Sequence, residues 1–365
     1  MNICLIGDGL TSLALAKNLV NKQINVCVYA KNIKKQKFQS RTLGISKNNF
    51  DFFNREILKL KKKLFWDIKQ IEVYSEKYKN EKILNFENSK KQLFSMLKND
   101  EIYNFLEDDL KKNRLYKKVL IKKNFFYKKI LKSQKYSLII NCDSKNEISK
   151  KFFYKKITKS YASNAYTTIM RHKSIANKKA VQIFTKIGPI AFLPISNSQT
   201  SVVYSIMNKD SSLDEKEIKE LIIKYNKNYK IKSFSKIEKF NLNFSATRNY
   251  YKNTIMAFGD VIHKIHPLAG QGFNMTLRDI KNFSRIIQNR IDLGLPIDHS
   301  IYEEFEKSAK HFNLIFALGI DFIYEFFNFD NKYSRSYSNL LLKLVNKNKF
   351  LNKFLTKYAD QGLVL

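Results

Sequence analysis

The residues best suited to chemistry lie in one stretch, residues 255–279, which reads IMAFGDVIHKIHPLAGQGFNMTLRD. The chain has only 10 glycines and 4 prolines in 365 residues, yet three of those glycines and one proline fall between positions 259 and 272. Asp260 directly follows a strand-like run, and ligands of open α/β sheets bind just past the carboxyl ends of strands. Its carboxylate is therefore placed to accept hydrogen bonds from a sugar hydroxyl.

The loop that follows offers backbone groups rather than reactive side chains. Gly270 and Gly272 precede a helix-like run and allow main-chain N–H groups to face a flat, electron-rich ring or a developing anion. His263 and His266 have no cysteine, glutamate or third histidine at a metal-ligand spacing, so we predict no metal site. His266 precedes Pro267, and we expect it to be either a hydrogen-bonded turn residue or a side chain next to the bound ring.

A second glycine motif opens the chain. Residues 7–12, GDGLTS, lie between a strand-like run and a helix-like run, with Gly7, Gly9 and Ser12 at the positions of a G-x-G-x-x-G pattern. The two glycines would let the backbone approach a pyrophosphate, whose negative charge a helix N-terminus stabilises. Ser12 is small enough to allow the close helix–strand packing for which the pattern uses its third glycine.

One part of this dinucleotide pattern is missing. A carboxylate for the ribose is expected about twenty residues after the glycines, at the end of the second strand. The sequence there reads Tyr29, Ala30 and Lys31. This segment alone is compatible with a dinucleotide site and also with an ordinary glycine turn.

Hydrophobic periodicity predicts the elements that must position these residues. Residues 2–31 read as strand, tight turn, helix and strand, the unit that opens a doubly wound sheet. Further helices are expected at 47–63, 90–112, 213–230 and from Gly272 onward, and further strands at 65–74, 82–88, 136–144 and 161–207.

The segment GDVIHKIHPLAGQGFNMTLRD resembles the signature of the flavin-dependent aromatic hydroxylases of ubiquinone biosynthesis, in the wider class of single-component FAD monooxygenases. The resemblance extends over almost the whole chain, including SRTLGIS at 40–46 and residues 161–196. It implies FAD as the cofactor and NAD(P)H as the reductant. The cofactor-binding residues that it implies are Gly7, Gly9, Ser12, Arg41, Asp143, Gly259, Asp260, Pro267, Gly270, Gly272 and Asn274, and its flavin-proximal loop comprises His266, Pro267, Gly270, Gln271 and Gly272.

The chain departs from the family pattern in its middle motif. The family has Asp-Gly followed by Ser and Arg, whereas this chain reads CDSKNEISK at 142–150. Asp143 is kept, but Ser144, Glu147 and Lys150 replace the glycine, serine and arginine. These changes, with the missing ribose carboxylate, bear on cofactor affinity and reduction more than on the fold.

The resemblance and the periodicity together predict an α/β fold. A Rossmann-type FAD-binding domain is interleaved with a β-sheet substrate domain, and a helical C-terminal region follows. The FAD-binding parts are expected at 1–70, 95–150 and 245–290, the substrate-domain sheet at 71–94 and 151–244, and the helical region at 291–365.

The activity implied by the resemblance is that of an NAD(P)H- and O2-dependent FAD monooxygenase, an oxidoreductase that hydroxylates the aromatic ring of a polyprenyl-phenol. Such a reaction needs few acid–base side chains, because the cofactor carries the chemistry while the protein binds, orients and excludes water. Two other interpretations remain open. One is a hydroxylase of another aromatic substrate, and the other is a degenerate flavoprotein that acts as a non-catalytic component of a complex with other ubiquinone-biosynthesis proteins.

The formal net charge of +35 at pH 7 has two interpretations. Lys far outnumbers Arg, and Asn, Ile, Phe and Tyr are abundant, which is typical of AT-rich coding sequence. Peripheral contact with an anionic membrane is the alternative, to which the aromatic run at 312–329 and the Lys-rich residues 338–357 could contribute. The aromatic run is equally consistent with a core helix. No nucleic-acid recognition motif is present, so a nucleic-acid partner is not expected.

The expected location is the cytoplasm, or the inner face of the membrane as a peripheral protein. The sequence starts in a strand-like run with no basic n-region or cleavage site, and no apolar run is long enough to span a bilayer. Cys4, Cys27 and Cys142 lie in apolar runs without C-x-x-C spacing, so we expect reduced thiols.

Overall fold

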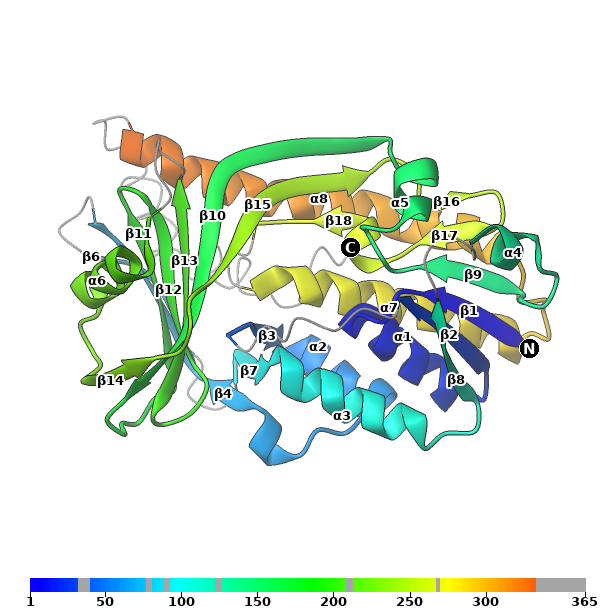
Figure 1. Ribbon diagram of the computed structural model, residues 1–365, viewed down its shortest axis with the longest axis horizontal. Helices are drawn as coiled ribbons and strands as arrows, with labels where there is room; N and C mark the ends of the chain where they lie inside the picture. Colours follow the sequence, from blue (N-terminus) through cyan, green and yellow to red (C-terminus); the bar gives the residue numbers. More distant parts are fainter. Residues whose placement is uncertain are drawn as a thin grey trace.

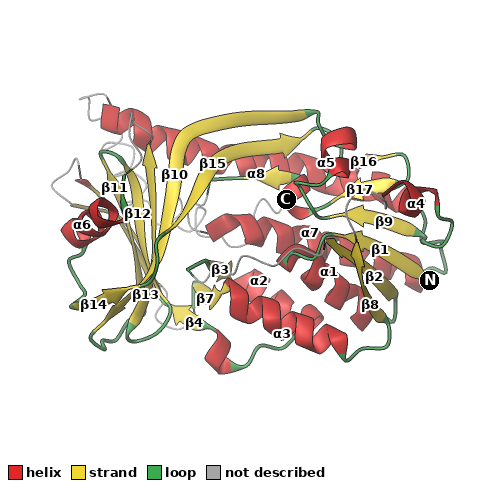
Figure 2. Ribbon diagram, viewed as in Figure 1, coloured by secondary structure: helices red, strands yellow, loops and turns green. Residues whose placement is uncertain are grey.

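The computed structural model describes residues 1–31, 40–76, 81–87, 92–121, 127–207, 213–266 and 270–332. Within these residues the chain forms two large sheets and a small one, with the longest helices lying along them (Figures 1 and 2). The chain passes from one large sheet to the other and back, so segments far apart in sequence are neighbours. This α/β architecture, with two interleaved sheets and helices towards its end, agrees with the predicted fold class.

The first sheet contains both strand-end motifs. Its strand order is β16-β17-β9-β1-β2-β8, and all neighbours pair in parallel except β16 with β17. Buried Ile, Val and Leu side chains on the central strands explain why these short apolar runs form a covered parallel sheet. The strands are β1 (Asn2–Ile6), β2 (Asn25–Lys31), β8 (Tyr116–Ile121), β9 (Leu138–Asn141), β16 (Tyr251–Lys252) and β17 (Ile255–Ala257).

The second large sheet has the order β18-β15-β10-β13-β12-β11-β5-β6, with β14 paired to β10. Most of its neighbours are antiparallel, and their residues alternate between the two faces. Its strands are β5 (Gln70–Ser75), β6 (Glu81–Glu87), β10 (Lys156–His172), β11 (Lys179–Thr185), β12 (Gly188–Pro194), β13 (Gln199–Met207), β14 (Ile231–Phe234), β15 (Glu238–Thr247) and β18 (His263–Lys264).

The small antiparallel sheet corrects one prediction. Residues 90–112 were expected to be helical throughout, but β7 (Phe94–Lys98) pairs with β3 (Thr42–Ser46) and β4 (Trp66–Ile68), and α3 begins only at Asn99. The apolar run FSML satisfies its backbone on these two neighbours, which a local helical pattern cannot reveal. The helix expected at 47–63 is also shorter, with α2 (Lys47–Phe52), a π-helical turn (Phe53–Ile57) and a separate 3-10 turn (Lys62–Leu64).

The helices bury one face each against the sheets. In α7 (Gln271–Asp292), Leu277, Ile280 and Phe283 recur at helical spacing and are fully buried. Helix α8 (Ser300–Lys332) runs beside both large sheets (Figure 1). The remaining helices are α1 (Leu10–Asn21), α3 (Asn99–Lys111), α4 (Tyr127–Lys132), α5 (Glu147–Phe152) and α6 (Glu215–Tyr225).

Candidate functional site

Three strand ends converge at one edge of the first sheet. Because β1, β9 and β17 are parallel neighbours, Gly7, Asp143 and Gly259 follow the same ends of adjacent strands. Gly7 has φ +107°, and a Cβ built on it would lie 3.0 Å from the Cβ and 3.2 Å from the amide nitrogen of Asp143. A glycine is therefore required for the first turn to lie against the middle motif.

The third strand end reaches the first helix in the same way. Gly259 has φ +60°, and a Cβ on it would lie 2.6 Å from Cγ2 of Thr11, in the first turn of α1. Asp260 follows in a 3-10 turn and is exposed. The two glycine motifs that the sequence analysis singled out thus contact each other, although 252 positions separate Gly7 from Gly259.

The N-terminus of α1 has the features of an anion site. Gly9 is its N-cap, and no described atom lies within 4 Å of a Cβ built on Gly9. The first turn of the helix contains no acidic residue. Since the first N–H groups of a helix have no intrahelical partner and carry partial positive charge, this turn can accept a phosphate group.

Ser12 lies on the buried side of the same turn. Its hydroxyl has no oxygen or nitrogen partner among the described residues. It lies near the Cys142 thiol, whose pKa is raised to about 12, mainly by burial. All three cysteines carry free thiols.

The start of α7 is fixed to β3 by Asn274. Its Nδ2 donates to the carbonyl oxygen of Gly44 (2.8 Å), and its Oδ1 accepts from the backbone N–H of Ser46 (2.9 Å) and from Nδ2 of Asn49 (3.0 Å). Gly270, the N-cap of α7, is left-handed (φ +66°), and a Cβ on it would lie 3.3 Å from the Gly44 nitrogen. Gly44 and Asn49 could not be predicted as part of this site, because only tertiary contacts connect them to the start of α7.

Because protein groups occupy both ends of the Asn274 amide, this side chain holds the backbone around the site. Its predicted contact with the cofactor stays a prediction. Arg41 is exposed and immediately precedes β3, which places its backbone beside the same clamp. Pro267 lies outside the described residues.

The first turn of α7 leaves room for a ligand. No described atom lies within 4 Å of a Cβ built on Gly272. The neighbouring Gln271 is buried, and its Oε1 has no hydrogen-bond partner among the described residues. A buried polar atom normally has a partner, so a group that donates a hydrogen bond fits at this position.

The two histidines of the motif have different surroundings. The Nε2 of His263 lies 2.8 Å from Oδ2 of Asp279 in α7, and Oδ1 of the same carboxylate accepts from Nδ2 of Asn313 in α8 at 2.7 Å. This network joins β18, α7 and α8. His266 is also buried, but its ring stacks on Tyr324, with centroids 4.0 Å apart and the planes 26° apart.

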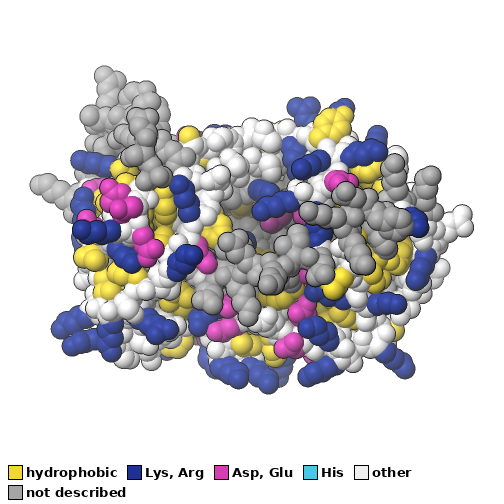
Figure 3. Space-filling view, viewed as in Figure 1, with side chains coloured by type: hydrophobic (Ala, Val, Ile, Leu, Met, Phe, Trp, Pro, Cys, Tyr) yellow, Lys and Arg dark blue, Asp and Glu magenta, His cyan; other side chains and the backbone are white. Residues whose placement is uncertain are grey.

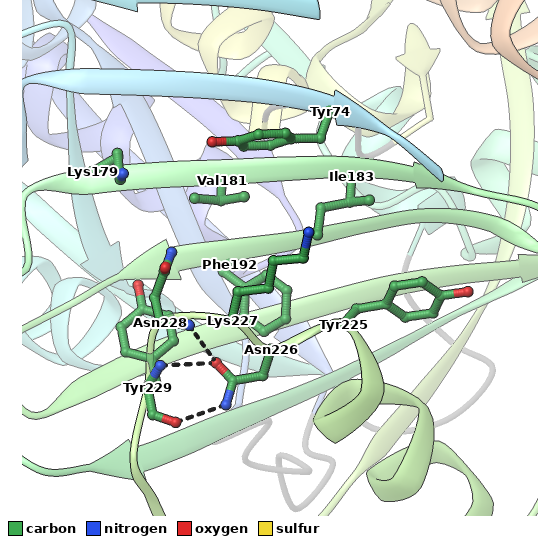
Figure 4. Close-up of a pocket in the computed structure, with 10 residues that line it drawn as sticks. All are labelled: Tyr74, Lys179, Val181, Ile183, Phe192, Tyr225, Asn226, Lys227, Asn228 and Tyr229. Carbon is green, nitrogen blue, oxygen red and sulfur yellow. Dashed lines mark hydrogen bonds between the residues drawn. The ribbon is translucent and has the colours of Figure 1, made fainter. Parts of the chain in front are cut away.

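A pocket of about 240 Å³ lies elsewhere, on the face of the second sheet that α6 covers (Figure 4). Ile183 points to this face, whereas its neighbour Phe184 packs with α7 and α8 on the opposite one. The pocket is therefore separated from the glycine motifs by the sheet. Its lining consists of Tyr74, Lys179, Val181, Ile183, Phe192, Tyr225, Asn226, Lys227, Asn228 and Tyr229.

The residues at the sheet edge fit FAD. The open N-terminus of α1 suits a pyrophosphate, the exposed Asp260 carboxylate suits a sugar or ribityl hydroxyl, and Gln271 has an unused buried acceptor. The ribose carboxylate of the usual pattern is not supplied by β2, which ends in Lys31.

Comparison with known proteins agrees with this fit. Residues 150–292 match the family described as FAD binding domain. The chain is 27% identical over 202 residues to a mitochondrial ubiquinone biosynthesis monooxygenase, COQ6, of Dictyostelium discoideum, covering 45% of this chain and 41% of the relative. It is 27% identical over 229 residues to the 3-demethoxyubiquinol 3-hydroxylase of Escherichia coli K12, covering 61% and 59%. The chain thus spans about half the length of the curated relatives that it matches.

Solved structures show the same fold. The p-nitrophenol 4-monooxygenase PnpA of Pseudomonas putida DLL-E4 has a TM-score of 0.77 at 11% identity and covers 99% of this chain and 98% of its own. HpxO of Klebsiella pneumoniae, solved with FAD and uric acid, has a TM-score of 0.71 at 10% identity, covering 99% and 96%.

The chain therefore has the fold of the single-component FAD monooxygenases. Its sequence is similar to monooxygenases and hydroxylases of ubiquinone biosynthesis, so the predicted resemblance is confirmed. The prediction of FAD as the cofactor is confirmed by the match to the FAD binding domain family.

Proposed function

We propose that this protein is an FAD-dependent monooxygenase that hydroxylates the aromatic ring of a polyprenyl-phenol in ubiquinone biosynthesis. The observation that carries the proposal is the convergence of Gly7, Asp143 and Gly259 at one sheet edge, beside a helix N-terminus that is open to a phosphate. The names of the relatives support the choice of pathway and of a phenolic substrate.

FAD, once reduced by NAD(P)H, supplies the activation of O2 that hydroxylation requires. The chain binds and orients the reactants. The N-terminus of α1 holds the pyrophosphate, and Asp260 accepts hydrogen bonds from the sugar or ribityl chain. The clamp between Asn274 and β3 fixes the α7 N-terminus, whose backbone at Gly272 would contact FAD when it is bound.

Water exclusion is the second task of the chain. The face of the second sheet that packs towards α7 and α8 is apolar, with Phe184 and Phe244 among its buried side chains, and Phe316 of α8 packs in the same cluster. An apolar wall of this kind prevents loss of the activated oxygen to water. It also suits an aromatic ring with a hydrocarbon tail.

The experiment is a coupled assay on purified protein that carries flavin. NAD(P)H oxidation, O2 uptake and hydroxylated product are measured with a short-chain prenyl-phenol and with an unprenylated aromatic compound. Product formed only from the prenyl-phenol supports the proposal, and product formed only from the other compound points to a different aromatic substrate.

A non-catalytic flavoprotein in a biosynthetic complex is the second candidate. It is favoured by the departures from the family pattern at Ala30, near the end of β2, and at Ser144 and Glu147 in the middle motif. The second candidate would be correct if the purified protein holds no flavin, forms no product and co-purifies with other ubiquinone-biosynthesis proteins.

The location follows from the substrate, because polyprenyl-phenols partition into lipid. We infer a cytoplasmic protein that contacts the inner face of the membrane peripherally. Lys and Arg side chains are spread over the visible face of the molecule (Figure 3), and one side of α8 exposes apolar side chains, namely Phe312, Ile315, Leu318, Phe322 and Ile323. Among the described helices, none has the length and apolar character needed to cross a bilayer.

Flotation with anionic and neutral vesicles, each at low and high salt, tests this location. Salt-sensitive binding to anionic vesicles supports it, since surface charge attraction is screened by salt. Binding to neither kind of vesicle would contradict it and would leave the net charge as a property of the coding sequence.

A further inference from the structure

Three histidines are buried in the described part of the chain, and they differ in their hydrogen bonds. Nδ1 of His172 lies 2.8 Å from the carbonyl oxygen of Lys173, and its Nε2 lies 3.0 Å from Oγ1 of Thr200. His263 bonds to Asp279. By contrast, neither ring nitrogen of His266 has a hydrogen-bond partner among the described residues, although the side chain is only 1% exposed.

An unpaired buried polar group is costly. Leaving one donor or acceptor without a partner costs about 1–3 kcal/mol, and such groups are rare in folded proteins. His266 lies two residues after the end of β18 and four residues before Gly270, the N-cap of α7, where the cofactor fits. The unpaired ring nitrogens of His266 are best explained by a ligand that forms a hydrogen bond with one of them.

The surroundings of His266 are aromatic. Its ring stacks on Tyr324 of α8, while Tyr161 of β10 meets both rings edge-on, with centroids 5.1 Å from His266 and 4.9 Å from Tyr324. Phe244 and Phe316 belong to the same buried cluster as the two tyrosines. We call the rings of His266, Tyr161 and Tyr324 the aromatic corner. It is suited to contact another aromatic ring.

The backbone directs Tyr161 into this corner. The register of β10 against β15 shifts between Ser160 and Ser163, which marks a bulge. Ala162 inside the bulge has φ +45°, a left-handed conformation that is unfavourable for a residue with a Cβ. Bulges re-aim side chains and occur next to active sites, and strained backbone of this kind also concentrates there.

The charge of the corner limits what it can bind. Burial lowers the pKa of His266 to about 3, so the imidazole is neutral near pH 7 and offers one N–H donor and one nitrogen acceptor. Asp321 lies close enough to counter this effect in part, and it also raises the pKa of Tyr161 in addition to burial. Lys159 forms ion pairs with both Asp321 and Glu325. A nearby carboxylate and a neutral imidazole favour an uncharged hydroxyl group over an anion.

We propose that His266 hydrogen-bonds the phenolic hydroxyl of the substrate, and that the aromatic corner selects neutral phenols over aromatic carboxylates. This inference rests on the proposed function and specifies its substrate class. A phenol hydroxyl both donates and accepts, so it can use either nitrogen of a neutral imidazole. Both nitrogens are closed to solvent in the structure, so binding requires a shift of a neighbouring side chain.

The test compares His266→Phe with His172→Phe in the flavin-bearing protein. Phe keeps the ring that stacks on Tyr324 and removes both nitrogens. Because His266 has no hydrogen bond to lose, we expect His266→Phe to unfold at the wild-type temperature or above. His172→Phe breaks the contacts to Lys173 and Thr200 and should unfold at a lower temperature.

Binding is then measured with two probes, 2-prenylphenol and the same phenol with a carboxylate para to the hydroxyl, by titration followed in the flavin absorbance. We expect wild type to prefer the neutral probe, and His266→Phe to bind it about tenfold more weakly or worse. His266→Gln, which keeps a donor and an acceptor, should recover part of the affinity. With 15N-labelled histidine, the His266 ring resonances should shift when 2-prenylphenol is added.

Several results would overturn the inference. Equal binding of 2-prenylphenol by wild type and His266→Phe would remove His266 from the substrate site while leaving the proposed function intact. A loss of flavin in His266→Phe, with normal folding, would make this side chain a cofactor contact instead. Tighter binding of the carboxylate probe would contradict the charge argument, and failure of wild type to bind or hydroxylate any phenol would contradict the proposed function itself.

Discussion

A Cβ on Gly259 would lie 2.6 Å from Cγ2 of Thr11, so the end of β17 reaches the first turn of α1 only because position 259 lacks a side chain. We expect Gly259→Ala to lower the thermal unfolding temperature by several degrees and to reduce the flavin content, because the clash pushes two parts of the site apart. Gly294→Ala is the matched control, since Gly294 has a similar φ of +63° but no described atom within 4 Å of its Cβ. Equal losses in both variants would show that backbone conformation, not the contact with Thr11, is responsible.

Gly9→Ala separates ligand binding from folding. Position 9 has φ −72°, which any residue can adopt, and its Cβ would point into open space. The flavin-free protein should therefore unfold as wild type does, whereas the Kd for FAD should rise about tenfold or more because the methyl group hinders approach to the helix N-terminus. Flavin fluorescence titration measures the Kd. An unchanged Kd would show that the pyrophosphate does not bind at this turn.

Asp260→Asn should release flavin during gel filtration. The side chain is exposed, so the fold does not depend on its burial, but the loss of charge weakens its hydrogen bonds to sugar hydroxyls. Asp292→Asn, at an exposed position near the end of α7, serves as the control. Full retention of flavin by Asp260→Asn would refute the assignment of this carboxylate.

Asn274→Ala tests the clamp between α7 and β3. The substitution removes the bonds to Gly44, Ser46 and Asn49 and leaves buried backbone groups unpaired. We expect the free energy of unfolding to fall by about 2–3 kcal/mol, measured by urea denaturation. The exposed Asn289→Ala on the same helix should cost little. A similar small cost for Asn274→Ala would mean that the clamp contributes little to stability.

Glu72 should contribute to acid stability. The carboxylate is buried; although burial alone would raise its pKa, hydrogen bonds from Lys82, Lys179 and Tyr74 lower that pKa to about 2. A depressed pKa stabilises the fold above the unfolded-state value, near 4.3, and this stability is lost as the pH falls towards 2. Glu72→Gln should therefore be less stable than wild type by about 2 kcal/mol at pH 7, and the difference should shrink below pH 4 in urea titrations. A pH-independent difference would assign the effect to packing instead.

Local patterns were sufficient to predict the edge of the first sheet. Gly7 and Gly259 each end an apolar strand-like run in a chain that otherwise uses very few glycines, and both conformations depend on the absence of a side chain. The same kind of reasoning failed at 94–98, because whether FSML becomes helix or strand depends on pairing with β3 and β4. Local sequence does not contain that information.

The contacts of Asn274 and His266 could not be predicted from sequence patterns either. Asn274 was predicted at the helix start, but its partners in and after β3 lie 225 or more positions earlier in the chain. Tyr161 and Tyr324 read as ordinary strand and helix aromatics, and only folding brings them against His266. What the sequence could not provide was therefore the set of long-range partners rather than the motif residues themselves.

The order of strands in the first sheet has a consequence for biosynthesis. The ribosome makes β1 first and β9 much later, and β17 follows only after the whole second sheet except β18 has emerged. Gly259 and Asp260 complete an edge whose first member, Gly7, is among the earliest residues made. The nucleotide site of a nascent chain therefore stays incomplete while more than half of the protein is synthesised. Flavin can bind only late, so flavin binding indicates that the whole interleaved core has folded.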